Sequence, residues 1–401
     1  MRDCCLACGG RILYPLYEPD PQPLAALNLP RSAEAAQRAL RFPIDFRVCA
    51  YCGHIFNTQF DYYKIPYADD SNLMYNGGSR WLGHLEGLVD LLLTKYDALG
   101  KTLVDIGCGD GRFLELLREK GPACRCIGFE PGIEANNARA KGFEVQQDYF
   151  HPERDLLAGR PDFLLCRHVI EHLADPRGFV AAIAYWCNLY ELFPVLLAEV
   201  PRIEKAVEGA RVVDFLYEHV SNFTDFSFRV MFESTGFEVL ELRPCYGDEV
   251  VVAVVQARKI GRIQTLRHAA EAFRQRIDRQ LVEVRGELRR LRAEGRTIAF
   301  WGGTGKGAAF LNAFRLAADE FPLVVDSDCH KVGRYVPATA QEIRSPDYLV
   351  RNPADVIVIT TRWRAGDILE EIRQRGIRCE TVLMLEGGQL RPCAGLGRVP
   401  E

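Results

Sequence analysis

The stretch LVDIGCGDGRFLELL, residues 103–117, decides the fold of this chain. Its first four residues predict a buried strand, Gly107, Gly109 and Gly111 predict a turn, and an amphipathic helix follows. Glycine lets backbone N–H groups approach a ligand closely and adopts backbone angles that other residues resist. A glycine-rich turn between a strand and a helix therefore predicts a cradle for a nucleotide-like cofactor.

The glycine spacing, GxGxG with Asp105 just before it, is typical of class I S-adenosylmethionine (SAM) methyltransferases; the GxGxxG of dehydrogenases would predict a different cofactor. Glu130 ends the next predicted strand, where a carboxylate can accept the ribose hydroxyls of a nucleotide, and Asp148 could receive the adenine amine. The residues predicted to contact SAM are Asp105, Gly107, Cys108, Gly109, Gly111, Glu130, Asp148 and His168.

The segment HVIEH, residues 168–172, follows the fourth predicted strand, where loops line the ligand cleft of such a sheet. An ordinary helix start is the simplest interpretation. The order HxxEH also resembles a zinc motif, but the sequence offers no third ligand, so we reject a catalytic metal there. His168 and His172 remain alternative catalytic bases.

Size and composition narrow the class of protein. The chain has 401 residues and a net charge of −4, so we expect two or three domains and no nucleic-acid partner. No apolar run is long enough for a membrane span, and the N-terminus MRDCCLACGG lacks the apolar core of a secretion signal. We therefore expect a cytoplasmic location, where the 14 cysteines favour metal binding over disulfides.

Two CxxC pairs near the N-terminus have the spacing of a structural zinc site. Four thiolates from two tight turns can close a tetrahedral site, with no open position for catalysis. The predicted ligands are Cys5, Cys8, Cys49 and Cys52. Cys4 in place of Cys5, His54 as a ligand, and free buried thiols are the alternatives.

Strand and helix signals alternate from about residue 76 to residue 257, which predicts an α/β fold with a mostly parallel, Rossmann-like sheet. Its last two strands, near 237–242 and 249–257, flank the turn-rich PCYGD and predict a hairpin. We predict three domains: a zinc-binding segment (1–75), a SAM-binding domain (76–258), and a linker helix with a second Rossmann-like unit (259–401).

Residues 260–294 predict a long arginine-rich helix with apolar residues at every third or fourth position. A linker helix packed along one face is the simpler interpretation, and a phosphate-contacting or oligomerising helix is the alternative. The oligomeric state is left open.

A second glycine-rich turn, WGGTGKG (301–307), joins another predicted strand and helix. It lacks the GxxxxGK[ST] form, so we reject an ATPase. Its N–H groups at a helix N-terminus predict an anion site for a diphosphate or nucleotide, whereas a tight turn with a solvated lysine is the alternative. The predicted substrate contacts are Gly303, Gly305, Lys306 and Asp326.

This order of segments resembles the sugar C-methyltransferases, which act on nucleotide-linked deoxy-keto-sugars. The stretch EVPRIEKAVEGARVVDFLYEHVSNFT (199–224) is similar to the signature of that family, and WGGTGKGAAFLNAF is similar to its second Rossmann-like unit. Glu218 and His219 fall on the acidic–histidine pair of the signature. The resemblance implies a small-molecule nucleotide-sugar substrate, with SAM and structural zinc as cofactors.

The resemblance also implies roles for site residues. His219 would remove the proton at C3 of a 4-keto sugar, Glu218 would orient it, and Tyr217 or Tyr75 would donate to the enolate oxygen. The chain departs from the family at Leu216, where the family has a tyrosine. An O- or N-methyltransferase on a related precursor is therefore one alternative. A non-catalytic zinc-ribbon scaffold with a degenerate methyltransferase domain is the other.

Overall fold

The structure is a computed structural model that describes residues 2–25, 30–65 and 77–393. It divides into two compact units, Met1–Gln264 and Thr265–Glu401. The segments predicted as the zinc-binding and SAM-binding domains therefore form one unit. Tyr75 lies outside the described residues.

A four-stranded antiparallel sheet explains why the first two segments stay together. Its strands lie in the order β1-β2-β3-β9, and β9 comes from far along the chain. The strands are β1 (Leu13–Tyr17), β2 (Phe46–Cys49), β3 (Ile55–Asn57) and β9 (Ser221–Asn222), with the short helix α1 (Ala33–Gln37) between β1 and β2. The pairing of β3 with β9 joins the cysteine-bearing segment to the rest of the unit.

The second sheet of this unit has seven strands in the order β10-β11-β8-β7-β4-β5-β6, and β11 alone among them runs antiparallel to its neighbours. The predicted β10–β11 hairpin is confirmed. The strands are β4 (Thr102–Ile106), β5 (Arg125–Phe129), β6 (Glu144–Gln146), β7 (Phe163–Arg167), β8 (Val195–Pro201), β10 (Phe237–Cys245) and β11 (Val250–Ala257).

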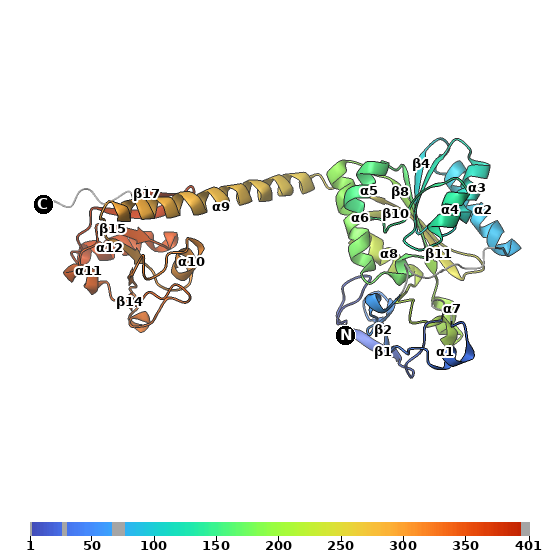
Figure 1. The fold of residues 1–401 in the computed structure, drawn as a ribbon, viewed down its shortest axis with the longest axis horizontal. Helices are drawn as coiled ribbons and strands as arrows, with labels where there is room; N and C mark the ends of the chain where they lie inside the picture. Colours follow the sequence, from blue (N-terminus) through green and yellow to red (C-terminus); the bar gives the residue numbers. More distant parts are fainter. Residues whose placement is uncertain (1, 26–29, 66–76, 394–401) are drawn as a thin grey trace. The chain divides into compact units, whose positions relative to one another are not determined.

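Helices cover both faces of this sheet (Figure 1). One face packs α2 (Ser79–Thr94), α3 (Arg112–Lys120) and α4 (Ala135–Ala140); the other packs α5 (Pro152–Gly159), α6 (Pro176–Tyr190) and α8 (Asp225–Ser234), and α7 (Glu204–Glu208) follows β8. Burial of Trp81, Leu85 and Leu88 at three- and four-residue steps explains how α2 docks. The strand order reverses at β4, and ligands of such sheets bind beyond the carboxyl ends of the strands at that point.

The second unit has a six-stranded sheet in the order β14-β13-β12-β15-β16-β17, parallel except at β17. The predicted second Rossmann-like unit is therefore present as a mixed sheet. Its strands are β12 (Ile298–Trp301), β13 (Leu323–Val325), β14 (Ile343–Arg344), β15 (Val356–Ile359), β16 (Thr381–Glu386) and β17 (Gln389–Pro392), and its helices after the linker are α10 (Lys306–Ala313), α11 (Asp347–Arg351) and α12 (Ala365–Gln374).

The predicted long helix is α9 (Arg262–Ala293), drawn in full in Figure 1. Val284 and Leu288, near its C-terminal end, are buried in the core of the second unit, whereas Leu266 and Phe273 are exposed. Packing along one face is thus seen in the last turns of α9. Among the described residues, no helix combines the length and the apolar character that a membrane crossing needs.

Candidate active site

The glycine-rich turn after β4 is tightly closed against β5. Gly107 has a φ of 76°, and a Cβ added to it would lie 2.4 Å from Cγ2 of Val169. The N–H groups of Gly107 and Cys108 both donate to the carbonyl of Phe129, at 2.8 and 3.0 Å. Gly111 begins α3 with a φ of 79°. These positions need glycine because the backbone there is left-handed and space is absent.

Glu130, at the end of β5, accepts backbone N–H groups with both carboxylate oxygens. Oε2 accepts from Gly109 at 3.1 Å and Oε1 from Gly132 at 2.7 Å. Burial raises the pKa of Glu130, while these hydrogen bonds lower it. The side chain is partly exposed and faces the pocket, so each oxygen keeps a lone pair for a ribose hydroxyl.

A pocket of about 770 Å³ lies over this turn, and it brings the predicted residues together. Of the eight residues predicted to contact SAM, all but Gly111 line it. The pocket is also lined by residues from later segments: His172, Leu216, His219, Tyr246 and Glu249. One cavity thus joins the predicted cofactor contacts to the predicted base.

His219 lines the pocket within a cluster that also contains His172. Its ring centroid is 4.8 Å from that of His172, and single polar atoms of Glu171, His172 and His219 lie within 4.8 Å of one another. Burial, with a smaller contribution from His172, lowers the pKa of His219 to about 3. His219 is therefore neutral at physiological pH and can accept a proton.

The other two members of the predicted catalytic segment face away from the pocket. Oε1 of Glu218 accepts the N–H of Ala25 at 2.6 Å, and the Glu218 carbonyl accepts Nδ1–H of His172 at 2.9 Å. Tyr217 is buried against Phe42, and its hydroxyl accepts the N–H of Asp61 at 3.0 Å. Leu216 lines the pocket instead, because one step along the chain turns the side chain to the other side.

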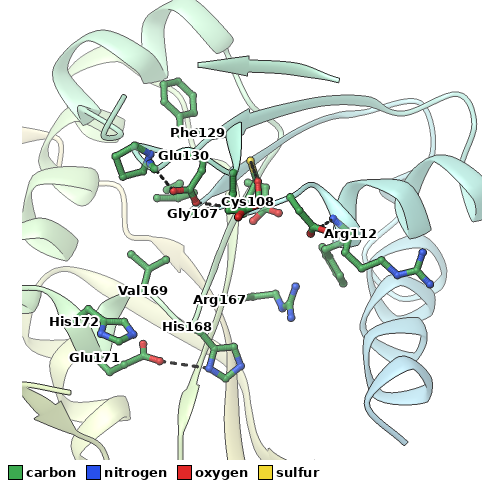
Figure 2. Close-up of a pocket in the computed structure, with 18 of the residues that line it drawn as sticks. Gly107, Cys108, Arg112, Phe129, Glu130, Arg167, His168, Val169, Glu171 and His172 are labelled. Carbon is green, nitrogen blue, oxygen red and sulfur yellow. Dashed lines mark hydrogen bonds and ion pairs between the residues drawn. The ribbon is translucent and has the colours of Figure 1, made fainter. Parts of the chain in front are cut away.

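Four polar residues near the pocket were not singled out from the sequence: His84, Arg167, Glu171 and Glu199. Glu199 is fully buried in β8, where it meets Nε2 of His84 at 2.5 Å, Nε2 of His168 at 3.0 Å and Nε of Arg167 at 3.3 Å. A carboxylate inside the apolar run VLLAEVP was a usable signal, because buried charges need partners. Figure 2 shows Arg167, His168, Glu171 and His172 on the same side of the glycine turn.

His168, one of the predicted SAM contacts, lines the pocket and is also held by two carboxylates. It lines the pocket with a left-handed backbone (φ 53°), and its ring lies between Glu171 and Glu199. Burial lowers the pKa of His168, but the two carboxylates more than offset this and raise it to about 9. His168 is therefore a cation at neutral pH and does not suit the alternative role of base.

Comparisons with known proteins agree with this geometry. Residues 83–242 match a family described as a methyltransferase domain, and residues 248–381 match one described as a C-methyltransferase C-terminal domain. The chain is a SAM-dependent methyltransferase.

Two curated relatives illustrate the likeness. This methyltransferase is 25% identical to the C-methyltransferase NovU of Streptomyces niveus, over 93% of this chain and 92% of NovU. It is 32% identical to the ubiquinone biosynthesis O-methyltransferase of Xylella fastidiosa (strain 9a5c), over 24% of this chain and 42% of that protein. Among solved structures, magnesium protoporphyrin IX methyltransferase (ChlM) from Synechocystis PCC 6803 matches 44% of this chain and 85% of its own, with 15% identity and a TM-score of 0.34.

The four predicted cysteine ligands of the methyltransferase converge. Sγ of Cys5 lies 3.6 Å from Sγ of Cys52, and Sγ of Cys8 lies 3.6 Å from Sγ of Cys49. A tetrahedral zinc site with Zn–S bonds of about 2.3 Å separates its sulfurs by about 3.8 Å, so the cluster fits zinc. Cys4 is not in the cluster, and neither is His54, whose ring packs on Phe56 and Phe223.

The second glycine-rich turn of the methyltransferase is closed in the same manner as the first. Gly305 has a φ of 56°, and Lys306 is exposed at the first position of α10. Asp326 accepts the N–H of Gly303 with Oδ2 and the N–H of Asp328 with Oδ1, both at 3.0 Å. Asp326 is only 4% exposed, so it stabilises the turn whether or not it contacts a substrate.

Proposed function

We propose that this methyltransferase transfers a methyl group from SAM to a carbon atom beside the ketone of a nucleotide-linked sugar. The observation that carries the proposal is the neutral, partly buried His219 in the same pocket as the glycine turn. The match of residues 248–381 to a C-methyltransferase C-terminal domain and the full-length likeness to NovU support carbon as the acceptor atom.

The residues at the glycine turn fit SAM. Gly107 and Gly109 give the ligand close access to the backbone, and Glu130 offers its remaining lone pairs to the ribose. Asp148, which is partly exposed and lines the pocket, suits the adenine amine. When bound, SAM supplies an electrophilic methyl carbon. The work left to the protein is to hold the acceptor in line, exclude water and remove one proton.

His219 is the proposed base. A carbon next to a ketone becomes nucleophilic only after its proton leaves, and a neutral imidazole at the pocket wall can take that proton. Glu218 acts through its backbone carbonyl, which fixes His172 beside His219. From the sequence alone, Tyr75 remains the candidate donor to the enolate oxygen.

The second unit is proposed to hold the nucleotide part of the acceptor. Lys306, the first residue of α10, is exposed, and its cation at the helix N-terminus would face the negative charge of a diphosphate. Gly303 and Gly305 shape this turn, and Asp326 keeps it closed.

The test uses a panel of nucleotide-linked 4-keto-6-deoxy sugars in deuterated water. With S-adenosylhomocysteine bound, we expect deuterium to enter the carbon beside the ketone, and with SAM we expect a mass gain of one methylene. Methylation without prior exchange would indicate an oxygen or nitrogen acceptor, which the loss of the family tyrosine at Leu216 favours as the second candidate. Failure of SAM to bind in calorimetry would leave only a scaffold role.

A further inference from the structure

A buried carboxylate stands among three imidazoles at the acceptor end of the pocket. Glu171, in the short helix η2 (Ile170–His172), is 1% exposed, and its Oε1 lies 3.4 Å from Nδ1 of His168. Figure 2 shows this contact, with His172 on the other side of the carboxylate. His219 reaches the same cluster from the segment before β9.

One oxygen of this carboxylate is not used by the fold. Oε2 of Glu171 is buried and has no hydrogen-bond partner among the residues that the structure describes. A buried carboxylate oxygen without a donor is costly, so its retention at a pocket wall needs a reason. Glu171 is ionised, because although burial raises its pKa, the hydrogen bond from His168 and the nearby His172 and His219 lower it below the usual value.

We propose that Glu171 is a positioning residue for proton removal, the fixed negative charge that stabilises the His219 imidazolium once the acceptor carbon has been deprotonated. The proposal rests on the proposed function and adds a residue to it. Glu171 acts through His219 and His172 and does not itself take the proton.

Deprotonation of the acceptor comes before methyl transfer. The C–H bond of the acceptor breaks, its proton moves to an imidazole nitrogen of His219, and its electron pair forms the enolate. The enolate carbon then bonds to the methyl group of SAM while the methyl–sulfur bond breaks and its pair stays on sulfur. His219 later returns its proton to water. During this sequence His219 is positively charged in a partly buried place beside the buried Glu171, where a nearby carboxylate has more effect than in water.

The neighbouring carboxylates have other partners. Oε1 of Glu218 accepts the N–H of Ala25. Glu199, in β8, contacts His84, Arg167 and His168. The charged and titratable groups that face His219 are His172 and Glu171 from η2 and His168 from the end of β7. Of these, Glu171 is the group that favours protonation of His219.

The experiment measures deuterium exchange into the panel sugar that the wild type exchanges fastest, with S-adenosylhomocysteine bound. Glu171→Gln removes the charge at constant shape, and we expect the exchange kcat to fall about 100-fold with KM and S-adenosylhomocysteine affinity unchanged. Glu171→Asp keeps the charge and should recover part of the rate. Asp155→Asn, which removes another buried carboxylate of the same unit, is the matched control and should exchange like wild type.

The pH profile separates this role from a structural one. Wild-type exchange should be flat from about pH 6 to 8, because His219 is already neutral there. In Glu171→Gln the residual rate should rise about tenfold per pH unit above about pH 7, as hydroxide replaces the unsupported base. If Glu171→Gln misfolds, it will lose S-adenosylhomocysteine binding, and Glu171→Asp then serves as the test. A Glu171→Asp protein that still binds S-adenosylhomocysteine but exchanges as slowly as Glu171→Gln would overturn the proposal.

Other outcomes are equally decisive. Equal exchange by wild type and Glu171→Gln overturns the Glu171 proposal and leaves the proposed function intact. Exchange that a strong chelator abolishes at unchanged zinc content would assign Glu171, His172 and His219 to a metal and overturn it as well. Absence of exchange from the wild type with every sugar overturns the proposed function and the inference that rests on it.

Discussion

The two glycine-rich turns of this methyltransferase are built alike and differ in what their carboxylates can reach. In the turn after β4, Glu130 accepts the N–H groups of Gly109 and Gly132. In the turn after β12, Asp326 accepts the N–H groups of Gly303 and Asp328. Glu130 is partly exposed and lines a pocket of about 770 Å³, whereas Asp326 is 4% exposed with Lys331 3.4 Å away.

An acidic residue after the second strand of such a unit can have two roles, to close the glycine turn and to contact a ligand, and this difference separates them. The acid after the second strand first closes the glycine turn, and it contacts a ligand only where its remaining lone pairs face a cavity. On this account the first turn is the SAM site, and the second contributes N–H groups and Lys306, with Asp326 as its internal support.

The strongest test of the comparison is Gly107→Ala. A Cβ at a φ of 76° and 2.4 Å from Val169 strains the backbone and displaces the side chain beside it, so SAM affinity should fall about 100-fold. Gly303→Ala, whose Cβ would lie 2.6 Å from Ile343, should destabilise the second unit and leave SAM affinity unchanged. Calorimetric titration with SAM measures the affinity of both variants. Equal losses of SAM affinity would contradict the proposed difference between the two turns.

Loss of the metal should affect the first turn's unit alone. Cys49→Ser should release zinc and lower the free energy of unfolding of the first unit by at least about 3 kcal/mol, because the site joins two distant knuckles. Scanning calorimetry with metal analysis checks this. Cys4→Ser, which lies outside the cluster, is the matched control and should keep its zinc. A zinc-free Cys49→Ser protein with unchanged stability would contradict a structural role.

The matched pair Glu130→Gln and Asp326→Asn sharpens the comparison. Each amide keeps one acceptor oxygen and turns an NH₂ group toward a backbone N–H, so both turns should loosen. Only Glu130→Gln should also weaken SAM binding, by about 10- to 100-fold, because only Glu130 faces the pocket. Isothermal titration with SAM decides it, and a comparable loss in Asp326→Asn would show that the second turn supports SAM too.

Local signals explain what the sequence could predict. The strand, turn and helix at 103–117 lie within fifteen residues, and Glu130 follows at the end of the next strand, so the structure of this glycine-rich turn was predictable. The CxxC pairs were predictable for the same reason, since each knuckle is a local turn.

Long-range packing explains what the sequence could not predict. The pairing of β3 with β9 joins residues more than 160 positions apart, and it merges two predicted domains into one unit. The meeting of Glu171 with His219 depends on the same packing. The direction of the Tyr217 side chain could not be predicted either, because it depends on the packing of its segment against the N-terminal sheet.

Lys306→Ala tests the second turn directly. Removing one exposed cation at the start of α10 should weaken binding of a nucleoside diphosphate about tenfold and leave SAM affinity unchanged. Competition titration with uridine and thymidine diphosphates measures the change. Undiminished diphosphate binding would leave the second turn a structural element.

The smallest expected effect is a pH dependence of stability at His168, beside the first turn. Because the pKa of His168 is raised to about 9 in the folded protein, its ion pairs stabilise fully below about pH 6.5 and lose their effect as pH rises through about 9. His168→Gln should therefore cost about 1–2 kcal/mol near pH 6.5 and less above pH 9. Urea unfolding at several pH values checks this, and a pH-independent difference would argue against a charged His168.

The central claim is that a carbon atom receives the methyl group in the pocket above the first turn. Incubating the wild type with ¹³C-methyl-SAM and the panel of nucleotide-linked keto-sugars, followed by NMR of the product, tests it most directly. We predict a carbon–carbon bond from the labelled methyl group to the position beside the ketone, absent in His219→Asn. A labelled methyl group on oxygen or nitrogen, or full activity of His219→Asn, would contradict the account.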